Sequence, residues 1–185
     1  MEVCYYFLAT LLRGMYLEII RIQPESPEWS ALVAHLKDGN DARWVLDEKD
    51  QPKEERLIFL GAQDGDQVVG NLTLRCQPVS IPHTEWAGER DRGVRDDQGD
   101  PLYETFVQTF RVAEVYWRKG IGRELQLKAL EITRQEGCIQ MRSWSSLDAQ
   151  ANYQLKFALG FAFHPEVQKT PSGLRVSGGY FVKRV

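Results

Sequence analysis

The chain is 185 residues long, the size of one domain able to bury a sizeable core. Its 43% hydrophobic and 26% charged residues are the proportions of an ordinary soluble globular protein. The formal net charge of −3 argues against generic nucleic-acid binding, and the three widely spread cysteines argue against a zinc site or disulfide scaffold and favour a reducing cytoplasm.

Residues 1–14 form an apolar N-terminal stretch that is too short to span a bilayer. The stretch lacks the cationic start and the small-residue cleavage site of a secretory signal, so we expect a cytoplasmic protein with no membrane partner. We interpret 1–14 as an extension and Met15 as the beginning of a single domain, 15–185. The alternative is a tail that docks or dimerises. We expect a monomer or a homodimer.

The first half of the domain alternates strand and helix signals. An apolar run before Pro24 predicts the first strand, and Ser26-Pro27 is typical of a helix start, with the serine as N-cap. The turn Asp64-Gly65-Asp66 joins two apolar runs into a β-hairpin. The expected elements are strand 16–23, a helix from 27 to 39, a short helix near 42–48, strand 56–62 and strand 67–76.

Residues 77–104 have no sustained period and are rich in glycine, proline and charge, with seven acids and three arginines. A loop this long inside a compact domain is usually functional or mobile. One interpretation gives it acidic and aromatic contacts to a cationic amine, Trp86 among them, and the alternative is a solvated insertion. His83 and Glu85 lack a third ligand at a suitable spacing, so we expect no metal.

The stretch 106–136 carries the strongest functional signal. The run 106–115 predicts a strand, and apolar residues at nearly helical spacing after the next turn predict a helix. Gly120 and Gly122 lie in that turn, where residues without a Cβ let backbone amides close on a ligand. Because free N–H groups and the positive dipole end of the helix meet there, the pattern predicts an anion site suited to phosphate. Five cations against two anions in 111–128 favour a polyanionic partner.

Two known phosphate motifs do not fit this turn. Leu125 stands where the dinucleotide fingerprint has its third glycine, and the Gly-Lys-Ser/Thr of a P-loop is missing. The turn resembles the pyrophosphate-binding segment of the GNAT superfamily of N-acetyltransferases, written V…Q/R-x-x-G-x-G/A, with Val112 and Gly120-Ile121-Gly122 at the matching positions. Trp117 replaces the expected glutamine or arginine. Taken alone, a glycine turn after a strand can also be a mere tight connection.

A second motif follows Gly137. The string SSLDAQANYQLKFALGF resembles the second GNAT motif, whose helix ends in LGF, and it stands at the correct distance from the first. The resemblance covers about 16–185. The expected elements are strand 138–144, a helix capped by Ser146 or Asp148, strand 162–168 and strand 179–185.

The second motif departs from the family at two positions. Lys156 stands where many members carry the tyrosine that protonates the leaving thiolate, and Ala149 stands where an asparagine is common. Tyr153, one helical turn before Lys156, shares its helix face and is a candidate to donate the proton or to stack on the cofactor. Asn152 is a candidate contact to the pantetheine arm. The alternative is that Tyr153 and Asn152 only satisfy local packing.

The resemblance implies an α/β (α+β) fold with a GNAT-like mixed, mostly antiparallel twisted sheet of six to seven strands, flanked by about four helices. The segment 77–104 would be a long insertion between the third and fourth strands. Acetyl-CoA (coenzyme A) is the implied co-substrate, without a metal. Its implied contacts are Phe110, Val112, Arg118, Lys119, Gly120, Ile121, Gly122, Arg123, Asn152 and Lys156.

The implied activity is N-acetyltransfer from acetyl-CoA to a primary amine of a small molecule, peptide or protein, by direct transfer in a ternary complex. Backbone N–H groups near Val112 would stabilise the developing oxyanion, and Glu104 lies near, but not on, the family's usual base position. No serine–histidine–acid or cysteine–histidine spacing competes. One alternative is a non-catalytic acyl-CoA-binding module of the same fold, motivated by Trp117 and Lys156. Another is a structural protein that dimerises through 1–14.

Overall fold

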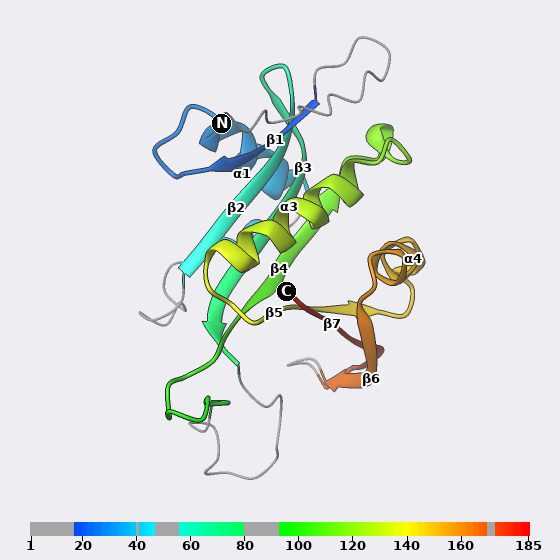
Figure 1. Ribbon diagram of the computed structural model, residues 1–185. Helices are drawn as coiled ribbons and strands as arrows, with labels where there is room; N and C mark the ends of the chain where they lie inside the picture. Colours follow the sequence, from blue (N-terminus) through cyan, green and yellow to red (C-terminus); the bar gives the residue numbers. More distant parts are fainter. Residues whose placement is uncertain (1–16, 40, 47–55, 80–92, 170–172) are drawn as a thin grey trace.

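Seven strands form one twisted sheet in the order β1-β2-β3-β4-β5-β7-β6 (Figure 1). This computed structural model describes residues 17–39, 41–46, 56–79, 93–169 and 173–185. The strands are β1 Leu17–Ile22, β2 Arg56–Asp64, β3 Gln67–Pro78, β4 Tyr103–Val112, β5 Gln140–Ser146, β6 Ala162–Lys169 and β7 Arg175–Arg184. The helices are α1 Trp29–Asp38, the single turn α2 Ala42–Val45, α3 Ile121–Gln135 and α4 Gln150–Ala158, with a 3-10 turn η2 Glu114–Tyr116. The expected mixed fold is confirmed.

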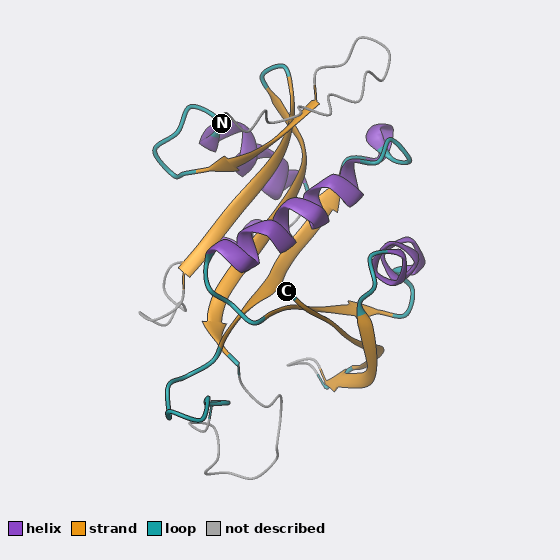
Figure 2. Ribbon diagram, viewed as in Figure 1, coloured by secondary structure: helices purple, strands orange, loops and turns teal. Residues whose placement is uncertain are grey.

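The junction of β4 and β5 is the exception in this sheet. Every other neighbouring pair is antiparallel, whereas β4 and β5 are parallel. Their pairing covers only Glu104–Phe106 against Gln140–Arg142. Beyond that point the two strands separate, as Figure 2 shows. The backbone edge of β4 after Phe106 therefore faces an opening instead of a partner strand.

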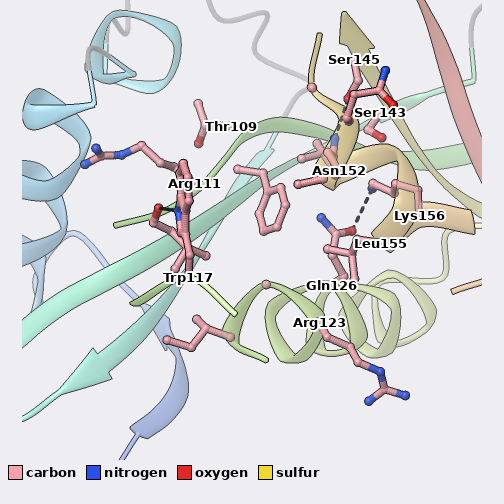
Figure 3. A pocket seen from close by; sticks show the side chains of 18 of the residues that line it. Thr109, Arg111, Trp117, Arg123, Gln126, Ser143, Ser145, Asn152, Leu155 and Lys156 are labelled. Atoms are coloured by element: carbon pink, nitrogen blue, oxygen red, sulfur yellow. Dashed lines mark hydrogen bonds between the residues drawn. The ribbon is translucent and has the colours of Figure 1, made fainter. Parts of the chain in front are cut away.

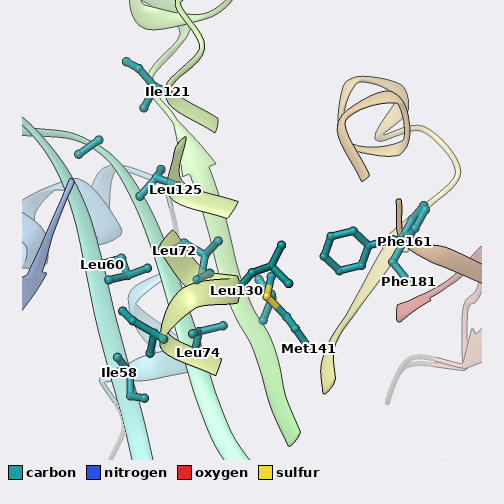
Figure 4. Close-up of a cluster of buried hydrophobic side chains, with 14 of the residues drawn as sticks. Ile58, Leu60, Leu72, Leu74, Ile121, Leu125, Leu130, Met141, Phe161 and Phe181 are labelled. Atoms are coloured by element: carbon teal, nitrogen blue, oxygen red, sulfur yellow. The ribbon is translucent and has the colours of Figure 1, made fainter. Parts of the chain in front are cut away.

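Helix α3 covers one face of the sheet and fixes the direction of its own N-terminus. Its apolar stripe, Leu125, Ala129, Leu130 and Ile132, is buried against Leu72 and neighbouring side chains of β2 and β3 (Figure 4). Burying a leucine contributes about 2 kcal/mol relative to leaving it exposed, so this stripe holds the helix firmly. Helices α1 and α2 pack in a second core together with Phe59 and Val68.

The insertion between β3 and β4 is partly folded back onto β3. Strand β3 continues to Pro78 and β4 begins at Tyr103, so Glu104 belongs to the sheet and not to the loop. The N–H of Val94 donates to the carbonyl of Val79 at 2.9 Å, and the N–H of Val79 donates to the carbonyl of Leu102 at 2.8 Å. The expectations for residues 1–14, His83, Glu85 and Trp86 fall outside the described residues.

Several element ends differ from those expected from the sequence. Helix α1 begins at Trp29 with Glu28 as N-cap, while Ser26 accepts the Trp29 N–H through its backbone carbonyl at 3.1 Å. Neither Ser146 nor Asp148 caps α4, whose N-cap is Ala149. None of the described helices has both the length and the apolar character needed to cross a bilayer.

Candidate active site

A cavity of about 910 Å³ fills the opening between β4 and β5 (Figure 3). Its wall is built by four parts of the chain: the second half of β4, the turn into α3 with the first residues of that helix, the end of β5, and α4. The two motifs recognised in the sequence thus line a single cavity, although α3 and β5 separate them along the chain.

The turn at the start of α3 forms one end of the cavity. Gly120 is the N-cap of α3 with φ of 82°, and Arg118 has φ of 60°, the only left-handed conformation of a non-glycine residue among those described. Such strain in a non-glycine residue tends to occur at functional sites. No side chain caps this 15-residue helix. Its first N–H groups therefore remain available, and the helix dipole adds positive potential there.

Gly122 keeps the neck of the cavity open. A Cβ at this position would lie 3.2 Å from Cζ of Phe110 and 3.6 Å from Cδ2 of Leu155. Phe110 comes from β4 and Leu155 from α4, so a side chain at Gly122 would contact residues of two other elements. A large side chain at this position would fill the passage from the turn to the parted strands. This is the physical reason for a glycine here.

The cations of 111–128 do not all gather at the turn. Arg118 and Arg123 line the cavity, and Figure 3 shows the Arg123 side chain extending outward. Lys119 is not part of the lining, and its Nζ lies 4.6 Å from the ring centroid of Tyr116. Arg111 also lines the cavity, but its guanidinium is directed toward α1, where Nη2 donates to the carbonyl oxygen of His35 at 2.7 Å. The positive charge at the turn is therefore smaller than the sequence count indicates.

Trp117 has a structural role of its own. Its indole Nε1 donates to the carbonyl oxygen of Val112 at 2.7 Å, while the residue remains 59% exposed. The residue that replaces the family's glutamine or arginine thus ties the end of β4 to the turn. The Val112 carbonyl already has this partner. Val112 and Ile121 both line the cavity, as the resemblance implies.

The inner end of the cavity is polar and buried. Lys156 is fully buried, and its Nζ donates to Oε1 of Gln126 at 2.8 Å. Burial lowers the pKa of this lysine from 10.5 to about 7. Asn152 donates from Nδ2 to Oγ of Ser145 at 2.5 Å. Among the described residues, Asn152 Oδ1, Gln126 Nε2 and Ser143 Oγ are buried without a hydrogen-bond partner.

Tyr153 is not brought to the cavity. The described residues that line the cavity do not include it, and its hydroxyl donates to the backbone carbonyl of Ser145 at 3.2 Å. Its ring packs against Phe157, Phe163 and Phe181. Burial raises the pKa of this phenol. Tyr153 and Lys156 are three residues apart, which is about 60° short of a full helical turn. This difference directs Tyr153 into the aromatic cluster while Lys156 faces α3.

Glu104 is not brought to the cavity either. It is fully buried, and its carboxylate accepts from Arg142 Nη2 at 2.5 Å and from Arg142 Nε at 3.0 Å. Gln77 and Gln140 donate to it at 3.0 Å and 2.8 Å. The reason is the register: Glu104 stands opposite Gln140, where β4 and β5 still pair, and the cavity begins beyond that point. The carboxylate is occupied by four donors within the sheet.

The sequence interpretation missed Gln126, Ser143 and Leu155, which line the cavity. A signal for Gln126 was present: it stands within the buried stripe of α3, four residues after Gly122, and a polar residue on a buried helix face needs a partner. Nothing in the sequence pattern singles out Ser143. Within the described part of the chain no three potential metal ligands come together.

A mixed sheet whose two parallel strands part beside a glycine turn and a helix N-terminus is the fold of an acyltransferase. Residues 17–161 match the family described as "Acetyltransferase (GNAT) family", and the chain belongs to this family. No match is found among curated proteins.

Solved structures share the fold over most of the chain. Arabidopsis thaliana NAA60 in complex with acetyl-CoA has a TM-score of 0.66 at 13% identity, over 92% of this chain and 99% of that one. The NatC complex bound to Gag peptide and CoA has a TM-score of 0.60 at 15% identity, with coverage of 92% and 99%. An acetyltransferase of the GNAT family from Streptococcus pneumoniae has a TM-score of 0.60 at 14% identity, with coverage of 92% and 100%.

Proposed function

We propose that this acyltransferase moves the acetyl group of acetyl-CoA to a primary amine. The observation that carries the proposal is one continuous cavity that runs from the uncapped N-terminus of α3, past Gly122, to the parted strands β4 and β5. Such a cavity can hold a diphosphate at one end and an extended arm along the free strand edge. Acetyl-CoA and CoA are bound by the NAA60 and NatC structures that share this fold.

The cavity wall fits coenzyme A. The amides at the start of α3, with Arg118 beside them, would hold the diphosphate, and the partnerless Oδ1 of Asn152 would accept a hydrogen bond from an amide of the arm. Phe110 and Leu155 would pack along it. When bound, coenzyme A supplies an activated thioester. The described residues need only position that thioester beside the acceptor.

Direct transfer to the acceptor is the route that the wall favours. No cysteine or histidine is among the described residues that line the cavity, so an acyl-enzyme route through either residue type has no candidate there. Because Glu104 is enclosed by its four donors, we propose that the acceptor amine loses its proton to solvent water instead of to this carboxylate. The acceptor is a small molecule or a peptide or protein amine.

The test uses thermal unfolding with and without acetyl-CoA. At a concentration 100 times its Kd a ligand stabilises the folded chain by about 2.7 kcal/mol, which corresponds to a rise in Tm of roughly 5 to 10 °C. Gly122→Trp should abolish the rise because the indole fills the neck. Val115→Trp is the matched control, since Val115 is 78% exposed and lies beside the same turn. An unchanged Tm of the wild-type chain in acetyl-CoA would contradict coenzyme binding.

A non-catalytic acyl-CoA-binding module is the second candidate, and one observation favours it. Both residues expected to move protons, Tyr153 and Glu104, lie outside the cavity wall. The discriminating assay is release of free CoA thiol from acetyl-CoA in the presence of a panel of amino acids, polyamines and peptides with free N-termini. Release that depends on an amine identifies a transferase, and tight binding without release across the panel identifies a binding module.

A further inference from the structure

Lys156 is a buried cation without a counter-ion. It is the largest of the fully buried side chains, and its Nζ contacts only neutral groups: Oε1 of Gln126 at 2.8 Å and the ring of Phe161 at 4.2 Å from the centroid. None of the described carboxylates forms an ion pair with it. A buried ammonium is normally paired with an anion. Lys156 is therefore expected either to pair with an anionic ligand or to be a neutral amine.

Hydrogen-bond donors beside Lys156 are also without partners. Nε2 of Gln126 and Oγ of Ser143 are buried, line the same cavity, and have no partner among the described residues. Buried polar atoms are rarely left unsatisfied unless a ligand or water completes them. Figure 3 shows Gln126, Ser143 and Lys156 arranged around one space, reached from α3, β5 and α4 respectively. An ammonium and two further donors point to a bound group that becomes negatively charged.

The position of this group along the cavity follows from how α3 runs beside β4. Gly122 lies beside Phe110 near the end of β4, and Thr133 bonds Thr105 near its beginning at 2.6 Å between hydroxyls. Moving along α3 from Gly122 therefore leads from the phosphate end toward the point where β4 and β5 part. Gln126 is one turn along this path. Lys156, which bonds Gln126, consequently lies beyond Gly122 on the side of the parted strands. The reactive end of a ligand whose phosphates lie at the turn would be placed there.

We propose that Lys156 is the catalytic acid that protonates the thiolate of coenzyme A as the acyl group leaves it. The inference rests on the proposed acetyl transfer. The acceptor nitrogen forms a bond with the acyl carbon, the carbon–sulfur bond breaks, and its electron pair goes to sulfur. Lys156 gives one N–H proton to that sulfur and becomes a neutral amine. It regains a proton from solvent, which has received the proton that the acceptor nitrogen lost.

The environment of Lys156 suits this task. Burial lowers its pKa to about 7, below the value of about 8.5 for an ordinary thiol, so proton transfer to a thiolate is downhill. The groups facing it are uncharged: Gln126 from α3, Ser143 from β5 and the ring of Phe161. The cavity-lining cation of α3, Arg123, has a side chain that is 59% exposed. Tyr153, the other titratable side chain on α4, is engaged with the Ser145 carbonyl inside the aromatic cluster.

The first test reads the sulfur directly and needs no acceptor. CoA is bound to the wild-type chain and to Lys156→Met, and thiolate formation is followed by its ultraviolet absorbance as the pH rises. Lys156 is an ammonium below about pH 7, and a nearby ammonium favours the thiolate, so at pH 6 to 7 the thiolate fraction of bound CoA should be several-fold higher in the wild-type complex than in Lys156→Met. Lys128→Met, which removes a lysine paired with Glu131 outside the cavity, should behave as the wild type.

The second test is kinetic and uses whichever amine of the panel gives turnover. Lys156→Met should lower kcat by about 10²- to 10⁴-fold, the usual contribution of a general acid, with little change in the KM for acetyl-CoA. Lys156→Arg keeps a positive charge but does not give up its proton, so kcat should fall similarly. In the wild type, kcat should decline as the pH rises above about 7, and this decline should be missing in both variants.

Several outcomes overturn the proposal. Equal thiol ionisation in the wild-type and Lys156→Met complexes, with CoA bound in both, would show that Lys156 does not lie near the sulfur. The proposed acetyl transfer would not be affected by that result. An unchanged kcat in Lys156→Arg would show that a positive charge at this position is sufficient and that Lys156 does not donate a proton. Succinyl-CoA that binds more tightly than acetyl-CoA only when Lys156 is present, with unchanged thiol ionisation, identifies a carboxylate site instead. A wild-type chain that binds no CoA overturns the proposed function and this inference together.

Discussion

The two ends of the cavity are built in different ways. At the start of α3 the ligand would meet backbone: the amides after Gly120, a left-handed Arg118 and Gly122, where a Cβ would press on the Phe110 ring. At the inner end it would meet side chains, with Lys156, Gln126 and Ser143 coming from three elements. A backbone site is continuous along the chain and tolerates changes in neighbouring side chains, as Trp117 illustrates. A side-chain site depends on how separate elements pack.

This difference shows where the family's pattern can vary. The departure at Trp117 leaves the turn intact, because the indole takes up a new hydrogen bond to Val112 while the amides stay in place. The departure at Lys156 would change the chemistry of the inner end, because it places a lysine where the resemblance implies a tyrosine. Three experiments test this contrast, in order of decreasing expected effect.

The largest effect is expected at the ion pair just beyond the inner end. Glu104→Gln leaves Arg142 as an uncompensated buried charge, so the free energy of unfolding should fall by about 3–5 kcal/mol. Urea denaturation measures this loss. Because Glu104 lies where the strands still pair, the affinity for acetyl-CoA should change little under conditions where the variant is folded. Normal stability with a strongly reduced kcat would instead support the catalytic base inferred from the sequence.

A pH-dependent effect on stability is expected from Lys156. Its pKa is lowered by burial from 10.5 to about 7, so between these pH values the unfolded chain binds more protons than the folded one. Stability contributed by this residue therefore rises with pH across that window, by about 1.4 kcal/mol for each pH unit. The measurement is the unfolding free energy of the wild type minus that of Lys156→Met at pH 7, 8 and 9. The same difference for Lys128→Met should stay flat, and a flat result for Lys156 would show an ordinary lysine.

The smallest effect is expected at the phosphate end. Removing the mostly exposed guanidinium in Arg123→Ala should weaken acetyl-CoA binding by about 0.3–1 kcal/mol, because the backbone amides remain. The loss should shrink when the salt concentration is raised, since exposed charges are screened. Titration calorimetry at two salt concentrations measures it, with Lys128→Ala as the control. A loss above about 3 kcal/mol would show that a side chain, and not the backbone, dominates this end.

Much of the fold was predictable because its signals are local. The β2–β3 hairpin around Gly65, the strand–turn–helix around Gly120 and the return of the chain after Gly160 all follow from glycine placement and apolar periodicity. Both Gly65 and Gly160 have positive φ, at 59° and 75°, as tight turns require. The fold class came from the resemblance to a family, since periodicity alone does not determine which strands pair.

The roles of single side chains were less predictable. Tyr153 and Lys156 share a helix face by spacing, yet a rotation of about 60° sends one into the aromatic cluster and the other to the cavity. Glu104 looked available as a base because its partners Gln77, Gln140 and Arg142 are distant in sequence. Gln126 stands out in the sequence as a polar residue on a buried helix face, but its partner Lys156 follows only from the packing of α4 against α3.

The amino-acid sequence by itself determined the backbone half of the proposed site: the glycine turn and the helix that follows it, whose uncapped N-terminus is the proposed anion site. These depend on φ/ψ freedom and on hydrogen bonds between near neighbours along the chain. Only the tertiary structure decided which titratable groups reach the cavity and which are enclosed in the sheet. Burial and partner choice set the protonation of a side chain, and both arise from contacts between segments far apart in sequence.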